Sequence, residues 1–257
     1  AKGYKYYDHG FHPNIPSNSA RAPARRFKVP LWDGKPLKGK TLLVWREQGV
    51  GDEILFLTMI PDLIKLHSNI ILEVDARLVD TISRSFPEIK VRAQNFGMPP
   101  HYDAVYHDYD VHIPIGSLMQ YVRPNLESYA NSKPFIQVDA SRQADFAERL
   151  QPYKDKVKIG ICWRSGNVDP LRNLHYLNLN KFGSLFEVEN FQIVNLQYGD
   201  CEAELVAAEN YFGKSILRWT DLNLKDDFDG TFALMTELDF IVTVGTSVHE
   251  MGGAVGT

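Results

Sequence analysis

The sequence predicts an α/β protein built from two successive units, each with a parallel sheet and covering helices. Short apolar runs of strand length alternate with longer segments of helical periodicity, an order typical of parallel sheets with crossover connections. The alternation begins with the apolar run at 41–45 and starts afresh at 157–163. We therefore expect domains at 38–150 and 151–257, preceded by a leader at residues 1–37.

Each element follows from its pattern of apolar residues. In the first unit we expect strands at 41–45 and 70–74, around Val91, at 104–106 and weakly at 134–138, with helices at 54–67, 77–85 and 143–150. In the second unit we expect strands at 157–163, 191–196, 216–217 and 240–244, with helices at 179–186, 202–210 and 229–235 and from Ser247 onward.

Composition excludes several classes of protein. The 257 residues are 44% hydrophobic and 23% charged with a formal net charge of -4, which is globular and argues against a broadly basic nucleic-acid binder. No apolar run approaches the roughly 18 residues of a membrane span, and no secretory segment opens the chain. The two cysteines, Cys162 and Cys201, lie too far apart for a zinc knuckle or a disulfide framework. We expect a soluble, cytoplasmic protein.

The leader differs in charge from the rest of the chain. Residues 1–40 hold nine Lys or Arg against Asp8 and Asp33, a net charge of +7. The remainder must then carry -11, so the leader is interpreted as a solvated linker or as a strip docked on an acidic body. Nucleic-acid binding through the leader is the weaker alternative. Tyr4 and Tyr7 stand at helical spacing, which predicts the tail of a helix near the start.

A first candidate site is the glycine loop, residues 46–53, between the first strand and its helix. Gly49 and Gly51 let a ligand approach the backbone. The third glycine of a dinucleotide fingerprint is missing, and Asp52 and Glu53 would repel a phosphate. The pattern favours carboxylate chemistry, with Asp52 as a general base. The alternative is that Asp52 only caps the helix.

Two loops of the second unit carry groups that suit phosphates. The arginine loop, residues 163–167, contains Arg164, and Arg172 follows; two arginines after a strand suit a pyrophosphate, the alternative being a solvated loop with a surface salt bridge. At 245–250 a strand meets a helix, where Thr246 and Ser247 can cap the helix or hold a phosphate. The chain lacks a Walker lysine, which excludes a P-loop NTPase.

No metal site is expected. His107 and His112 would point to opposite faces of an extended segment, and no second ligand cluster accompanies them. His249 is more typical of a hydrogen-bonded structural histidine than of a ligand. Cys162 is interpreted as a buried thiol in a strand.

Four blocks of sequence resemble one bacterial family in the same order. They are WDGKPLKGK at 32–40, EQGVGDEILF at 47–56, IGICWRSGN at 159–167 with Arg172, and LDFIVTVGTSVHEMGGAVG at 238–256. They resemble the glycosyltransferase-like domain that follows tetratricopeptide repeats and is similar to heptosyltransferases. The resemblance implies a GT-B fold, in which two Rossmann-like domains face each other across a cleft.

The resemblance also implies roles for residues. A nucleotide-sugar would be the donor, without an obligatory metal or cofactor, and a protein or glycan reached through preceding repeats would be the acceptor. Asp52 would be the base, the start of the last helix would hold the donor phosphates, and Gln197 would lie near the base or ribose. The donor- or substrate-binding candidates are Gly49, Gly51, Arg164, Ser165, Gly166, Asn167, Arg172, Gln197, Thr246, Ser247 and His249.

The sequence departs from the family pattern at its last motif. Gly245 stands where the family has Asp, and Glu250 where it has His, and the final strand-helix pairs are missing, so we expect an incomplete C-terminal domain. The leading hypothesis is a glycosyltransferase. The alternatives are a non-catalytic module with a degenerate donor site, which would bind no nucleotide, and a nucleotide-sugar epimerase, which would form product without an acceptor.

Overall fold

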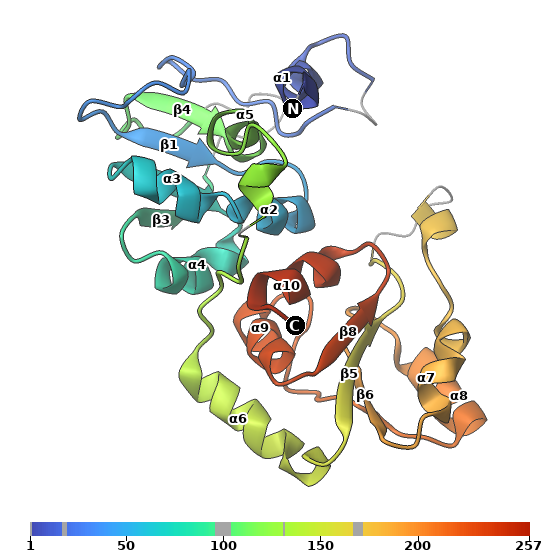
Figure 1. Ribbon diagram of the computed structural model, residues 1–257. Coiled ribbons are helices and arrows are strands. Elements are labelled where there is room, and N and C mark those ends of the chain that lie inside the picture. Colours follow the sequence, from blue (N-terminus) through green and yellow to red (C-terminus); the bar gives the residue numbers. More distant parts are fainter. Residues whose placement is uncertain (1, 17–19, 96–103, 131, 167–171) are drawn as a thin grey trace. The chain divides into compact units, whose positions relative to one another are not determined.

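The computed structural model describes the chain except for residues 1, 17–19, 96–103, 131 and 167–171. It folds as two compact units, Ala1–Phe135 and Ile136–Thr257. Each unit is an α/β layer structure around a four-stranded parallel sheet (Figure 1).

The first unit is built on the predicted apolar runs. Its sheet has the order β3-β2-β1-β4, with Leu42 of β1 paired to Ile70 of β2 and to Val111 of β4. All four residues of β1 are buried, as expected for a central strand covered on both faces. The strands are β1 (Leu42–Trp45), β2 (Ile70–Val74), β3 (Lys90–Ala93) and β4 (Val111–Pro114), and the helices are α1 (Lys2–Tyr7), η1 (Asp8–Phe11), α2 (Val50–Leu57), α3 (Ile60–Leu66), η2 (Ala76–Leu78), α4 (Val79–Ser85), η3 (Ile115–Leu118), α5 (Met119–Val122) and η4 (Glu127–Tyr129).

The second unit repeats the same topology, with the order β7-β6-β5-β8. Its core is formed by side chains such as Ile161, Trp163 and Ile193 packed under the helices. The strands are β5 (Val157–Cys162), β6 (Phe191–Asn195), β7 (Ile216–Leu217) and β8 (Phe240–Thr243), and the helices are α6 (Ala140–Leu150), η5 (Gln151–Tyr153), η6 (Arg172–His175), η7 (Leu179–Phe182), α7 (Gly183–Glu187), α8 (Glu202–Phe212), α9 (Phe228–Thr236) and α10 (Ser247–Val255).

This topology fixes where each unit can bind a ligand. Successive strands run outward from β1 to β3 and from β5 to β7, and the chain then returns to place β4 beside β1 and β8 beside β5. The strand order therefore reverses between β1 and β4 and between β5 and β8. Ligands of open parallel sheets bind at the carboxyl ends of the strands at such a reversal. The loops that follow these four strands are thus the candidate ligand-binding segments.

Three predicted elements differ from the structure. The fourth strand lies at Val111–Pro114, where Val111 and Ile113 are buried, and Ala104 makes only an isolated bridge. The stretch 134–138 forms no strand. The predicted helix 54–67 is two helices, α2 and α3, because Pro61 has no N–H to continue the first and begins the second.

The boundary predicted at residue 150 is also displaced. Helix α6 belongs to the second unit, because it packs on α9 and the segment before it. Arg142 forms an ion pair with Asp227, and the Phe146 ring meets Trp219 edge to face at 5.6 Å between ring centroids. These contacts involve residues far along the chain, which a sequence pattern does not show.

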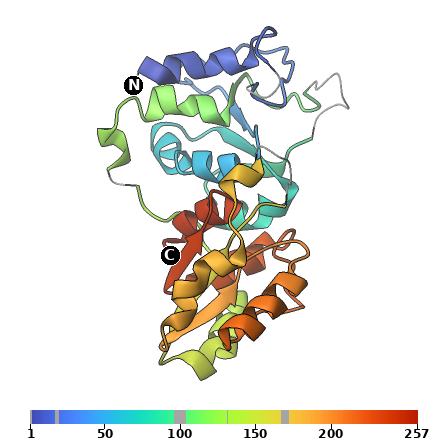
Figure 2. The ribbon, with the colours of Figure 1, turned by 90° about the vertical axis from the view of Figure 1, so that its right-hand side faces the viewer.

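The leader is a docked strip and not a solvated linker, so the first unit does not begin at residue 38. Arg21 and Arg25 reach into the unit and pair with the buried carboxylates of Glu47 and Glu73. The Phe27 ring stacks on His112 of β4 with 3.7 Å between centroids. Helix α1 lies beside α5, as Figure 2 shows. Two arginines of the leader thus neutralise two carboxylates that are buried in the first unit.

No helix in the described part of the chain is long and apolar enough to cross a membrane.

Candidate functional site

The glycine loop lies where β1 ends, at the strand reversal of the first unit. Gly49 is the N-cap of α2, and its N–H donates to Asp52 Oδ2 at 3.2 Å. Asp52 therefore caps the helix, as the alternative interpretation held. Its carboxylate is nevertheless exposed and carries a second oxygen that can face a substrate. Gly51 lies in the first turn of α2, one residue before Asp52.

Glu53, the neighbour of Asp52, is a buried structural acid. Its Oε2 accepts from Arg46 Nε at 2.5 Å and its Oε1 from the Asp75 N–H at 2.8 Å. Burial raises the pKa of Glu53 to about 7, against the opposing charge of Arg46. The pair ties the glycine loop to the end of β2. Of the three acids in the loop, Glu47, Asp52 and Glu53, only Asp52 is open to solvent.

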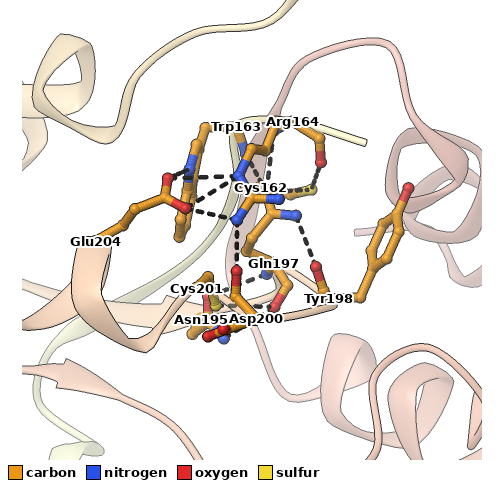
Figure 3. A network of polar contacts seen from close by, with 9 residues as sticks. All are labelled: Cys162, Trp163, Arg164, Asn195, Gln197, Tyr198, Asp200, Cys201 and Glu204. Carbon is orange, nitrogen blue, oxygen red and sulfur yellow. Dashed lines mark hydrogen bonds and ion pairs between the residues drawn. The ribbon is translucent and has the colours of Figure 1, made fainter. Parts of the chain in front are cut away.

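Gln197 organises the corresponding edge of the second unit (Figure 3). Its side chain is buried, and its Oε1 accepts from the backbone N–H groups of Trp163 and Arg164 at 3.1 and 3.0 Å. Its Nε2 donates to the Tyr198 carbonyl at 2.9 Å. The amide predicted to meet a base or ribose is thus used within the protein. Gln197 joins the end of β5 to the end of β6.

Arg164 also has partners within the protein. Its guanidinium donates to the Glu204 carboxylate of α8 and, through Nη2, to the Asp200 carbonyl at 2.7 Å. Figure 3 shows Glu204 holding Trp163 and Arg164 from one side. The Arg164 charge is therefore balanced before any diphosphate arrives, which corresponds to the salt-bridge alternative for this loop.

Of the other residues of the arginine loop, the structure describes Ser165 and Gly166. Ser165 Oγ accepts from the Tyr198 hydroxyl at 3.2 Å. A Cβ on Gly166 would lie 3.1 Å from the Tyr198 ring, so glycine allows that close packing. Asn167 lies outside the described residues. Arg172 begins η6, and its side chain is outside the described set as well.

The start of α10, which follows β8, lies at the strand reversal between β5 and β8. Thr246 is the N-cap of α10 but forms no side-chain cap bond; its Oγ1 lies 3.7 Å from Cys162 Sγ and 3.4 Å from Thr243 Oγ1. Ser247 is the first helical residue. His249 is exposed, and its N–H donates to the Thr246 carbonyl. Thr246 and Ser247 thus lie next to the arginine loop. The sequence predicted these two segments only as separate motifs.

Cys162 is a buried strand thiol, as predicted. Its Sγ lies 3.5 Å from Gln197 Oε1, and burial raises its pKa. A thiol with a raised pKa is a poor nucleophile at neutral pH.

A cavity of about 520 Å³ lies beside these loops, over the carboxyl ends of β6 and β7. Its size is that of a small-molecule site. Sequence reasoning found Gln197 but missed the segment after β7, because β7 has only two residues and no motif follows it. Trp219, two residues after that short strand, was the one available signal. The cavity is lined by side chains that include Asn195, Tyr198, Asp200, Arg218, Trp219, Leu222 and Asp226.

The described residues contain no group of three or more His, Cys, Asp or Glu side chains that could hold a metal ion. His107 is exposed, whereas His112 accepts a hydrogen bond from Trp45 Nε1 at 3.1 Å and is stacked on Phe27. Burial lowers the pKa of His112 to about 4, with the charge of Arg25 as a further cause. His112 is thus a half-buried residue that is neutral near pH 7 and packs against Phe27.

Comparison with known proteins shows the fold. The chain is 29% identical over 269 residues to protein FlbA of Caulobacter vibrioides and spans 44% of its length. The structure resembles a family 9 glycosyl transferase of Veillonella parvula (TM-score 0.55, 13% identity, 85% of this chain and 79% of the other). It also resembles the E. coli heptosyltransferase WaaC with ADP (TM-score 0.51, 13% identity, 84% of each chain). No family model matches the chain.

Proposed function

We propose that this chain is a glycosyltransferase that moves a sugar from a nucleotide-sugar donor to a hydroxyl group of a protein or glycan. The observation that carries the proposal is the arrangement of two features along the carboxyl edge of the second sheet. The cavity over β6 and β7 and the start of α10 after β8 lie along this one edge. Strands lie about 4.8 Å apart, so β6 and β8 are separated by about 10 Å. A ribose and a diphosphate can bridge that separation.

The donor would use two kinds of contact. The cavity is lined by the aromatic residues Tyr198 and Trp219, to which we assign the nucleobase. Thr246 and Ser247 begin a nine-residue helix, whose N-terminal N–H groups and dipole favour a diphosphate. Because Arg164 is already paired with Glu204, we assign the diphosphate charge to the helix and to Arg172. Metal-independent transfer is part of the proposal.

On the acceptor side we assign the base to Asp52. Its exposed carboxylate would take the proton of the acceptor hydroxyl as that oxygen bonds to the anomeric carbon. The bond from that carbon to the phosphate oxygen breaks, and the nucleoside diphosphate leaves with the electron pair. The reaction requires the edges of the two units to face each other, which is the GT-B arrangement that we propose. The fold shared with heptosyltransferases supports this arrangement.

A second candidate is a non-catalytic module. It is favoured by the internal use of Arg164 and Gln197, two of the predicted donor contacts. The departures from the family pattern at Gly245 and Glu250 in the last motif also favour a non-catalytic module. The two candidates differ in whether a nucleotide binds.

A thermal-shift titration with ADP, UDP, GDP and CDP, each with and without magnesium, tests the proposal. We expect one nucleotide to raise the melting temperature saturably, and magnesium to make no difference. Arg172→Ala and Tyr198→Ala should weaken the shift. Tyr211→Ala is the matched control, because Tyr211 is 81% exposed on α8 and does not line the cavity. No shift with any nucleotide would favour the non-catalytic module.

A further inference from the structure

The cavity over β6 and β7 depends on a segment that has little regular structure of its own. This segment, residues 218–227, runs from the end of β7 to the start of α9, and we call it the cavity wall. It consists of turns and irregular chain, and it supplies Trp219, Leu222 and Asp226, among others, to the lining. Strand β7, which precedes it, has only two residues. A segment of this kind keeps one conformation only where neighbouring elements hold it.

Helix α6 presents one face to the cavity wall. Arg142, Phe146 and Arg149 are four and three residues apart, so their side chains lie on one side of the helix. Phe146 is buried, and its ring meets Trp219 edge to face with 5.6 Å between the ring centroids. Aromatic rings in this arrangement attract each other beyond the effect of their contact area. The Trp219 ring is therefore held from the α6 side.

Two ion pairs fix the wall further along the chain. Arg149 donates through both Nη atoms to the Asp221 carboxylate, at 2.9 and 2.8 Å. Arg142 forms a similar two-point pair with Asp227, in which Nη1 donates to Oδ1 at 2.6 Å. A Cβ on Gly230 would lie 2.6 Å from Arg142 Nη2, so glycine leaves room for this pair. Two-point pairs fix geometry as well as charge, so α6 holds the wall at two places besides the ring contact.

The side chains that support the wall lie outside the cavity. The described lining of the cavity includes neither Asp221 nor Asp227, and it includes no residue of α6. Trp219 has both kinds of contact, because it lines the cavity and meets Phe146. A side chain that is held before its ligand arrives loses less conformational freedom on binding. The contacts with α6 should therefore contribute to the affinity for whatever binds against Trp219.

We propose that Phe146 and Arg149 are positioning residues for Trp219: they hold the cavity wall so that its aromatic ring is in place for the nucleobase of the donor. Phe146 acts on the ring itself, and Arg149 acts through Asp221, two residues after the ring. This inference rests on the proposed function for the nucleobase. The structural part, that α6 holds the wall, stands without it.

Arg149 allows a matched test, because it pairs with two exposed acids. Asp221 belongs to the cavity wall, whereas Asp145 belongs to α6 itself, and a carboxylate oxygen of each lies 2.8 Å from Arg149 Nη2. Asp221→Asn and Asp145→Asn remove the same charge, but only Asp221→Asn loosens the wall. In the full chain without nucleotide, we expect amide hydrogen exchange over residues 219–227 to be about fivefold faster in Asp221→Asn and unchanged in Asp145→Asn.

Nucleotide binding gives the second measurement on the same two variants. The probe is whichever of ADP, UDP, GDP and CDP binds the unaltered chain. Its Kd should rise about threefold to fivefold in Asp221→Asn and stay unchanged in Asp145→Asn. Because both variants lose one negative charge, a general electrostatic effect on an anionic nucleotide would change both Kd values alike.

A further variant separates the nucleobase from the diphosphate. Phe146→Leu keeps an apolar side chain but removes the ring edge on Trp219. We expect it to raise the Kd of the same nucleoside diphosphate about fivefold to tenfold and to leave the Kd of inorganic pyrophosphate unchanged. The matched control is Phe186→Leu, because Phe186 of α7 is also buried and its ring is stacked on Phe212. This change should leave both Kd values as they are.

The outcomes distinguish this inference from the proposed function. Equal exchange over residues 219–227 in Asp221→Asn and the unaltered chain overturns the hold of α6 on the wall. Faster exchange with an unchanged nucleotide Kd overturns its consequence for the donor, and so does an equal loss of pyrophosphate binding in Phe146→Leu. Absent nucleotide binding in the unaltered chain overturns the proposed function instead. Faster exchange in Asp221→Asn then still supports the hold of α6 on the wall.

Discussion

The guanidinium of Arg21 forms a two-point ion pair with the carboxylate of Glu47, with Nε donating to Oε2 at 2.5 Å and Nη2 donating to Oε1. The two residues are 26 positions apart, and the side chains are 2% and 0% exposed. Glu47 Oε1 also accepts from the Gly116 N–H at 3.0 Å. One buried carboxylate thus joins the leader, the glycine loop and the segment after β4.

Removing the Arg21 charge should destabilise the first unit. Arg21→Met leaves Glu47 buried and unpaired, and we expect the free energy of unfolding to fall by about 3–5 kcal/mol. Urea unfolding of the full chain measures it. The double variant Arg21→Met/Glu47→Gln removes both charges and keeps an acceptor for Gly116, so it should recover at least half of the loss. Arg26→Met, at an exposed leader position, is the control; a loss of equal size there would contradict the explanation.

Replacing the exposed acid of the glycine loop should stop transfer without unfolding the protein. Asp52→Asn keeps an oxygen that can accept from Gly49 but removes the base, so we expect turnover to fall by about 10²–10⁴-fold and nucleotide binding to stay unchanged. Asp80→Asn, in the exposed first turn of α4, is the matched control. Full turnover in Asp52→Asn would mean that another group takes the proton.

Stability should depend on the protonation of Glu53. Burial raises its pKa from 4.5 to about 7, so between these values the native state holds a proton that the unfolded chain releases. The contribution is complete below pH 4.5 and is lost as the pH rises through 7, a change of about 3 kcal/mol.

Comparison with Glu53→Gln isolates this effect. Urea unfolding from pH 4 to 8 should show a difference between the two proteins that changes across that window. His112, with a pKa lowered to about 4, acts in the opposite direction and is present in both proteins. A difference independent of pH would show that folding does not raise the pKa of Glu53.

Arg164 and Arg172 should differ in their effects on stability and on nucleotide binding. Arg164 is paired with Glu204 near the surface, so Arg164→Ala should cost about 1 kcal/mol of stability and change the nucleotide Kd less than twofold. Arg172→Ala should raise that Kd about tenfold with little effect on stability. A large rise in Kd for Arg164→Ala would show that the guanidinium leaves Glu204 when the donor binds.

Much of the fold could be predicted because it depends on local patterns. The apolar runs at β1, β2, β5 and β6 become buried central strands, and the restart of the pattern gives a second unit with the same strand order. The prediction failed where a local pattern was weak. Strand β4 contains His112 and Pro114, and it is a strand because it pairs with β1 and buries Val111 and Ile113.

The loops that form the candidate site could be predicted from the sequence, but the contacts among their side chains could not. Glycines, arginines and cap residues at strand ends mark the carboxyl edge of each sheet, and within each unit the topology brings the loops at the strand reversal together. Only the tertiary structure decides which polar side chains stay available to a ligand: Arg164 and Gln197 are used within the protein, whereas Asp52 is exposed. The same holds for the leader, whose basic character the sequence shows. Its partners Glu47 and Glu73 are chosen by packing, because a buried carboxylate needs a cation at hydrogen-bond distance, whatever its position in the chain.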